Sequence, residues 1–178
     1  MRSTQQPPTS AVANVTGCSA VRFAAVVFFR RLWVSSGVRS KRMKEGWHND
    51  EYVILFEGHE VEQKGQEYGI DRLLPGYSLL GLVGWDDFLV MERASQKVFR
   101  IPTIPISAEH RKEWQHSVDS TALKPDERFR GKVKWYVKPI VFGGDPSPGE
   151  NMTWISHGDH VQAVKYWNEM YSHVAGKG

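Results

Sequence analysis

Two histidines near the C-terminus, His157 and His160, have the spacing most like half of a metal site. They lie three residues apart at the expected start of a helix, with Asp159 between them. A catalytic zinc ion needs three protein ligands and an open position. The third ligand could come from His59 or His110, but no spacing favours either. Exposed histidines are common near helix starts, so we predict that the chain binds no metal and keep a metal-assisted hydrolase as an alternative function.

A tryptophan and two carboxylates, Trp85, Asp86 and Asp87, lie in a short connection between two expected strands. Neighbouring residues of a strand point to opposite faces, so the two carboxylates are not expected to act as an acid–base couple on one substrate. A rigid scaffold would expose them, and we predict that Trp85, Asp86 and Asp87 contact a partner. The structural alternative is that Asp86 accepts backbone hydrogen bonds of its own turn and that Trp85 covers the core.

The sequence contains no other pattern typical of catalysis or cofactor binding. The glycine-rich stretch 143–149 matches neither phosphate-loop motif, and its aspartate and prolines repel phosphate and remove hydrogen-bond donors. No G-x-S-x-G motif is present. A lone cysteine, Cys18, excludes an internal disulfide and a cysteine zinc site. We therefore predict no cofactor and no enzymatic activity, in a reducing, cytoplasmic compartment.

The positive charge is concentrated at the N-terminal end. Residues 1–43 hold seven of the 23 Lys and Arg and none of the 20 Asp and Glu, so the rest carries 16 bases against 20 acids, a net charge of −4. Nucleic-acid binding needs a basic face, so we predict no nucleic-acid partner for residues 44–178. The apolar run 23–29 is far shorter than the roughly twenty residues that cross a bilayer, so we also predict no membrane partner.

The same break in composition predicts the domain organisation. We expect a basic extension over 1–43 that lies outside the fold, and a single domain over 44–178, because 178 residues suffice for one well-packed domain but not for two. Three interpretations of the extension remain open: a transit-like peptide, a short amphipathic helix, or residues upstream of a natural start at Met43.

Hydrophobic patterning predicts the first half of the domain. β-Branched and aromatic residues over 52–56 indicate a buried strand. Residues 60–68 are typical of a short, solvent-facing helix interrupted by Gly65. The Pro75-Gly76 turn then precedes a three-stranded antiparallel meander, with strands over 77–83, 87–92 and 97–101.

The second half is less regular until the C-terminus. Prolines take the chain out of the sheet after 101, and Ser107 is expected to begin a short helix over 107–114, followed by a polar loop over 117–131. The alternation of apolar residues with lysines over 132–142 predicts a half-buried strand with its lysines on the solvent-exposed face. A C-terminal helix should begin at Ser156 and end at Gly176, with an apolar stripe of Val161, Val164, Trp167 or Asn168, Tyr171 and Val174. We therefore predict an α+β fold with a small, mostly antiparallel sheet, flanking helices and a C-terminal amphipathic helix packed on the sheet.

The segment from about 52 to 106 resembles the SUKH superfamily, which includes fungal cell-wall-synthesis regulators and many bacterial immunity proteins. The matching features are a strand followed by an acidic helix, YVILFEGHEVEQKGQEYGI, the Leu-Pro-Gly-Tyr sequence at 74–77 and an apolar strand ending in Gly81. Three further features follow in the same order: the short connection at 84–87, the strand at 88–91, and the Val98-Phe99 strand that runs into Ile104-Pro105-Ile106.

This resemblance implies an intracellular protein-binding domain, most plausibly an immunity protein that neutralises a cognate toxin. An acidic body suits a basic, nuclease-type toxin, because complementary charge raises the association rate. A housekeeping scaffold that binds a cellular protein through the same face is the further alternative.

Overall fold

The computed structural model describes residues 43–115, 119–147 and 149–176. Within these ranges the chain forms a six-stranded antiparallel sheet with its strands in chain order and a separate two-stranded sheet. The strands of the larger sheet are β1 (Lys44–His48), β2 (Glu51–Leu55), β3 (Tyr77–Val83), β4 (Asp87–Glu92), β5 (Val98–Pro102) and β6 (Lys112–Glu113). The smaller sheet pairs β7 (Lys132–Tyr136) with β8 (Met152–Ser156).

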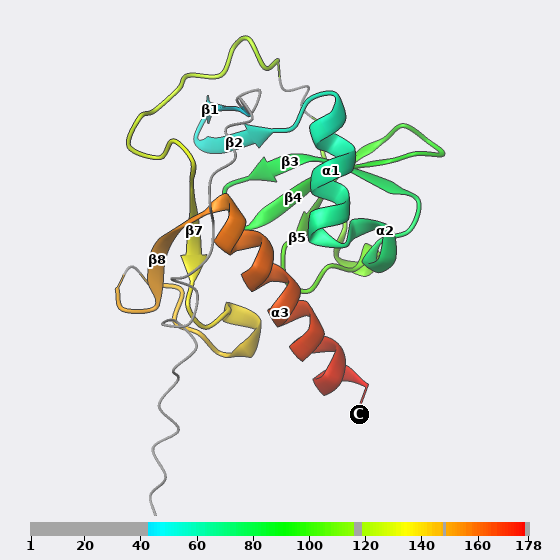
Figure 1. The fold of residues 1–178 in the computed structure, drawn as a ribbon, viewed down its shortest axis with the longest axis vertical. Helices are drawn as coiled ribbons and strands as arrows, with labels where there is room; N and C mark the ends of the chain where they lie inside the picture. Colours follow the sequence, from blue (N-terminus) through cyan, green and yellow to red (C-terminus); the bar gives the residue numbers. More distant parts are fainter. Residues whose placement is uncertain (1–42, 116–118, 148, 177–178) are drawn as a thin grey trace, which may run out of the picture. The chain divides into compact units, whose positions relative to one another are not determined.

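Three α-helices accompany these sheets: α1 (His59–Tyr68), α2 (Ile70–Leu73) and α3 (His157–Ala175). Helix α1 crosses β3 and packs beside α3, and α3 also contacts both strands of the small sheet (Figure 1). The predicted α+β class, with a C-terminal helix packed on the sheet, is confirmed. The predicted basic extension over 1–43 lies outside the described residues, apart from Met43.

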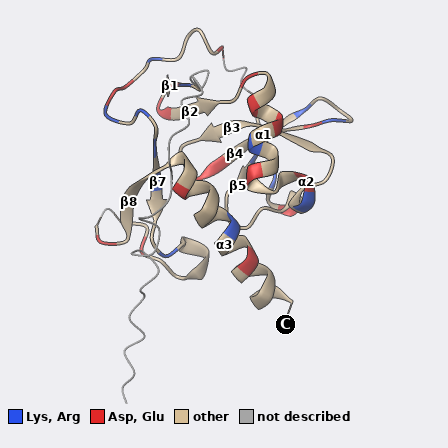
Figure 2. Cartoon of the chain, in the orientation of Figure 1, with Lys and Arg blue, Asp and Glu red and all other residues tan. Residues whose placement is uncertain are grey.

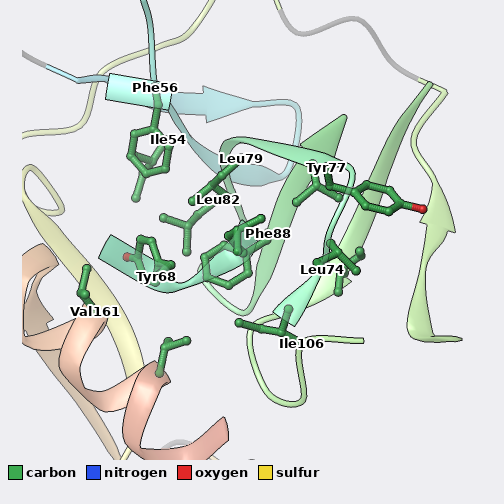
Figure 3. Packing of buried hydrophobic residues seen from close by; sticks show 14 of the residues in the cluster. Ile54, Phe56, Tyr68, Leu74, Tyr77, Leu79, Leu82, Phe88, Ile106 and Val161 are labelled. Carbon is green, nitrogen blue, oxygen red and sulfur yellow. The ribbon is translucent and has the colours of Figure 1, made fainter. Parts of the chain in front are cut away.

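The central meander was correctly predicted because burial and turn chemistry agree there. Strands β3, β4 and β5 pair as consecutive antiparallel neighbours. Their inward side chains, with Tyr68 of α1 and Val161 of α3, form the main core; Figure 3 shows Leu79, Leu82 and Phe88 meeting Tyr68 at its centre. The core is thus assembled by elements that lie about ninety residues apart in the sequence.

Helix α1 differs from the expected interrupted, solvent-facing helix. It continues through Gly65 and buries Tyr68, and Ile70 follows as the first residue of α2. The tertiary burial of the two apolar residues at its end outweighs the low helix propensity of one interior glycine, which costs about 1 kcal/mol.

The segments after β5 depart most from the sequence-based expectation. Ser107 does accept a hydrogen bond from the Glu109 amide, but it caps only the short 3-10 helix η2 (Ala108–His110) before β6. The expected strand over 132–142 ends at Tyr136 and is followed by the 3-10 helix η3 (Ile140–Phe142), because Pro139 cannot continue a strand ladder. Strands β1 and β8 were not predicted.

Helix α3 begins where it was expected. Ser156 is the N-cap, and its Oγ accepts a hydrogen bond from the Asp159 amide at 3.2 Å. Val161, Val164 and Asn168 are buried as part of the predicted stripe, whereas Val174 is 61% exposed because no described element covers the last turn. None of the helices in the described ranges is long and apolar enough to span a membrane.

Gly81 allows β2 and β3 to approach each other closely. A Cβ atom at this position would lie 2.1 Å from the Ile54 carbonyl oxygen, next to the irregularity between Leu79 and Gly81 in the β3–β4 register. This clash is with backbone, so a side chain at position 81 would force the two strands apart.

We expect Gly81→Ala to lower the free energy of unfolding by about 3 kcal/mol, the upper range for overpacking a closely packed site. Urea unfolding monitored by tryptophan fluorescence measures the change. Gly158→Ala is the control, because a Cβ there would meet only the Ser156 Oγ, at an ordinary 3.8 Å. Equal stability of the two variants would contradict this role of Gly81.

Candidate functional site

The β3–β4 turn contains two consecutive residues with left-handed backbone, Gly84 (φ 61°) and Trp85 (φ 66°). Glycine adopts this conformation freely, but a bulky residue rarely does. The turn is fixed from both sides: the Gly84 amide donates to the Tyr52 carbonyl at 2.9 Å, and the Asp86 carbonyl accepts from the Thr103 amide at 2.9 Å. The direction of the Trp85 side chain is therefore set by the backbone.

Trp85 is held inside a cluster of five aromatic rings. Its indole stacks on Tyr52, with centroids 5.1 Å apart and an interplanar angle of 11°, and contacts Trp47, Phe129 and Trp154 edge-on. Such ring pairs stabilise beyond simple area burial by about 1 kcal/mol each, which offsets the strain of the left-handed turn. Trp154 is the outermost ring, with 38% of its surface exposed.

Two ion-paired groups flank this cluster. Asp86 accepts a hydrogen bond from Lys134 Nζ at 2.7 Å, and that ammonium also lies 5.9 Å from the centre of the Trp85 ring. On the other side of the turn, Arg100 pairs with Asp87 at 2.8 Å and with Glu51 at 2.7 Å. Each carboxylate of the turn is therefore tied to a cation from a different strand.

Two of the three carboxylates in these pairs, Asp86 and Glu51, are clearly more exposed than their cations. The side chains of Asp86, Glu51 and Asp87 are 49%, 37% and 28% exposed, whereas those of Arg100 and Lys134 are 25% and 19% exposed. Partial burial acts to lower the pKa of Lys134, but the hydrogen bond and charge of Asp86 raise it above its ordinary value. Figure 2 marks acidic residues on β4 and basic residues on β7.

We call the surface formed by these ion pairs and the outermost ring the turn surface; its members are Glu51, Asp86, Asp87, Arg100, Lys134 and Trp154. The predicted partner-binding residues lie together on it, with Asp86 exposed, Asp87 half-buried and Trp85 half-buried beneath Trp154. Sequence reasoning missed Lys134 and Trp154. Lys134 was expected on the wet face of its strand, and Trp154 belongs to strand β8, which was not predicted.

The histidine pair lies in a different environment from the one expected. His157 and His160 are buried, not exposed, because the first turn of α3 packs against α1 and the small sheet. His160 Nδ1 lies 2.7 Å from the Tyr68 hydroxyl, and the Trp135 ring covers the imidazole edge-on. His160 Nε2 and both ring nitrogens of His157 have no hydrogen-bond partner among the described residues.

The structure does not bring a third ligand to this pair. His59 and His110 are exposed on α1 and η2, and the described residues contain no cluster of three or more His, Cys, Asp or Glu side chains suited to a metal ion. The pair is instead a buried, uncharged contact between α3 and α1.

Burial lowers the pKa of both histidines. The pKa of His157 falls to about 4, with a further contribution from the Lys64 ammonium, and that of His160 falls to about 3, with a further contribution from His157. Both rings are therefore neutral in the fold at neutral pH.

A second exposed feature is apolar. Seven large hydrophobic side chains are exposed among the described residues. Six of them come from η3, from Val137 three residues before η3, and from the second half of α3. Phe142 joins these elements by contacting Trp167 and Tyr171. We call this the α3–η3 surface; its exposed members are Val137, Ile140, Val141, Tyr166, Met170 and Val174.

Comparison with known proteins yields no relative: no protein-family model, curated protein or solved structure matches the chain significantly. The residues of the turn surface are therefore interpreted from their own geometry.

We expect the free energy of unfolding to fall as the pH drops from about 6.5 toward about 4. The folded pKa values lie below the ordinary value of 6.5, so the unfolded chain binds more protons in this window and acid favours unfolding. Each ring contributes a slope of up to about 1.4 kcal/mol per pH unit. Urea unfolding at a series of pH values between about 6.5 and about 4 measures this slope.

His157→Leu should reduce this slope by about half, because one of the two buried rings is removed, and should not destabilise the protein at neutral pH, since no described hydrogen bond is lost. The control is His59→Leu, at an exposed position at the start of α1. An unchanged slope in His157→Leu would show that burial of this ring does not govern the acid response.

Proposed function

We propose that residues 44–178 form a protein-binding domain that neutralises a protein toxin by covering a basic region of the toxin. The proposal follows the resemblance of residues 52–106 to SUKH immunity proteins and the net charge of −4 of this part of the chain. It is an interaction function, which needs a rigid, exposed surface and no catalytic group.

The observation that carries the proposal is the distribution of charge at the turn surface. Asp86 and Glu51 are more exposed than the cations with which they pair, and Asp87 is about as exposed as Arg100, so the exposed charge of these pairs is mainly negative. Ion pairing with Lys134 and Arg100 orients the carboxylates, and oriented charges lose less side-chain entropy on binding. This arrangement favours a partner whose exposed groups are Lys or Arg.

Trp154 supplies an apolar contact beside the charged groups. Tryptophan is among the residues that contribute most to protein interfaces, and the 38% exposure of Trp154 leaves one part of its ring free while Phe129 and Trp85 hold the rest. A basic partner could thus be attracted by Asp86 and anchored on Trp154.

A second candidate, a scaffold in a lasting complex with a cellular protein, is favoured by the α3–η3 surface. Large exposed apolar areas mark interaction sites, and lasting complexes use more apolar interfaces than transient ones. The salt dependence of binding distinguishes toxin neutralisation from a scaffold function. Binding through the turn surface weakens as ionic strength rises, whereas binding through the α3–η3 surface does not.

The direct test is co-expression with the toxin-like product of a neighbouring gene. Neutralisation predicts that the chain rescues growth and that the two proteins purify as a complex. Absence of both rescue and complex would overturn the toxin proposal.

Asp86→Lys should slow association with the toxin about tenfold at low salt, because it reverses the most exposed charge of the turn surface. Stopped-flow or surface plasmon resonance measures the association rate. Glu169→Lys, the same charge reversal on an exposed position of α3, is the matched control and should change the rate little. Equal effects of the two reversals would indicate general charge attraction rather than a defined surface.

A further inference from the structure

A groove lies between α1 and the beginning of β3, away from the turn surface. Its volume is about 430 Å³, and its lining includes Val61, Glu62 and Gly65 of α1, Asp71 of α2, Leu79 of β3 and Arg93. Leu79 is fully buried in the main core, so the apolar side chain that the groove offers to a ligand is the half-buried Val61, while Glu62, Asp71 and Arg93 form the charged rim.

Gly65 keeps this groove open. It lies in the interior of α1, where glycine is less favourable than alanine, and a Cβ atom built on it would meet no described atom within 4 Å. Val61 and Glu62 precede it by four and three residues, so all three lie on the same face of the helix. Packing of the described fold therefore does not require a glycine here, but an unobstructed groove does.

The strand beside the groove is covered on one side only. Strand β2 pairs with Gly81–Val83 and ends there, whereas β4 pairs along all of β3. No strand of the described sheet therefore flanks Tyr77–Leu79 on the side away from β4, and these three residues line the groove. An extended segment could lie along this part of β3, as in recognition by strand addition.

The rim of the groove favours a positively charged ligand. Arg93 is already engaged, with its guanidinium donating to Asp71 Oδ1 at 2.8 Å and to Ser78 Oγ at 3.0 Å. Glu62 is exposed and forms no ion pair with any described residue. The rim holds two acids, Glu62 and Asp71, and one base, Arg93. Because Arg93 pairs with Asp71, the carboxylate of Glu62 remains without an ion pair among the described residues.

We propose that the α1–β3 groove binds an extended peptide segment in which an apolar side chain lies on Val61 and an adjacent Lys or Arg pairs with Glu62. This site does not depend on the toxin proposal. The groove adjoins the first residue of β3 and the turn surface follows its last residue, about 20 Å away at roughly 3.3 Å per residue. Variants at one site should therefore leave the other intact.

The test titrates the full chain, labelled with nitrogen-15, with a synthetic peptide of alternating valine and lysine. The expected result is a change in the amide resonances of Tyr77–Leu79 and of α1, and binding at least about tenfold weaker for the matched peptide of alternating valine and glutamate. Equal binding of the two peptides, or shifts confined to other elements, would overturn the proposal.

Gly65→Leu should weaken binding of the basic peptide about tenfold by filling the groove, and Glu62→Lys should do so by reversing its charge. Gln66→Leu places the same side chain at the next, exposed position of α1 and is the control for Gly65→Leu. Gly65→Ala should raise the melting temperature while still weakening binding, because alanine favours the helix and narrows the groove. Peptide binding by Gly65→Leu equal to that of the unmodified chain would overturn the groove as the site.

Asp86→Lys separates this proposal from the toxin proposal. It should leave binding of the basic peptide unchanged while slowing association with the toxin. Loss of peptide binding in Asp86→Lys would place the peptide on the turn surface and refute the groove.

Discussion

The packing of Trp85 between Tyr52 on one side and the rings of Phe129 and Trp154 on the other is the interaction on which the arrangement of the two sheets depends. Tyr52 belongs to β2 and Trp85 to the β3–β4 turn, while Phe129 and Trp154, which pack on Trp85, come from the approach to β7 and from β8. A left-handed backbone at a tryptophan is tolerated only when the surroundings determine it, and the ring cluster does so here. The ring contacts of Trp85 that join the sheets also fix the position of the neighbouring Asp86, so the geometry of the turn surface follows from the packing beneath it.

Helix α3 is attached to the domain by polar groups as much as by apolar ones. Asn168 is fully hydrogen-bonded: its Oδ1 accepts from the Ile106 amide at 2.7 Å, and its Nδ2 donates to the Thr103 and Val164 carbonyls. The histidine pair at the other end of the contact retains unpartnered nitrogens. Satisfied polar groups specify a single docking position, so Asn168 fixes where the helix lies, whereas the histidines make its attachment sensitive to acid.

The sequence predicted the parts of the fold in which local and tertiary preferences agree. The meander of β3, β4 and β5 and the cap of α3 at Ser156 combine turn residues, periodicity and burial, and all were found as expected. Strand β1 was missed although it pairs with β2 through a local two-residue turn at 49–50, whereas the bridge between Trp47 and Lys124 could not be predicted, because it depends on a contact across more than seventy residues. The burial of His157 and His160 was missed for the same reason, since a helix start exposes its side chains unless another element covers them.

The predicted site residues lie close to a cation that is distant in the sequence. Position in a turn identified Trp85, Asp86 and Asp87, but it could not reveal that Lys134, forty-eight residues after Asp86, lies beneath the carboxylate. The Lys134 ammonium holds the Asp86 carboxylate fixed at the surface next to the half-buried indole of Trp85. The turn therefore presents charge that is oriented by the core, which a flexible acidic loop of the same composition would not do, and oriented charge is what gives a surface selectivity among basic partners.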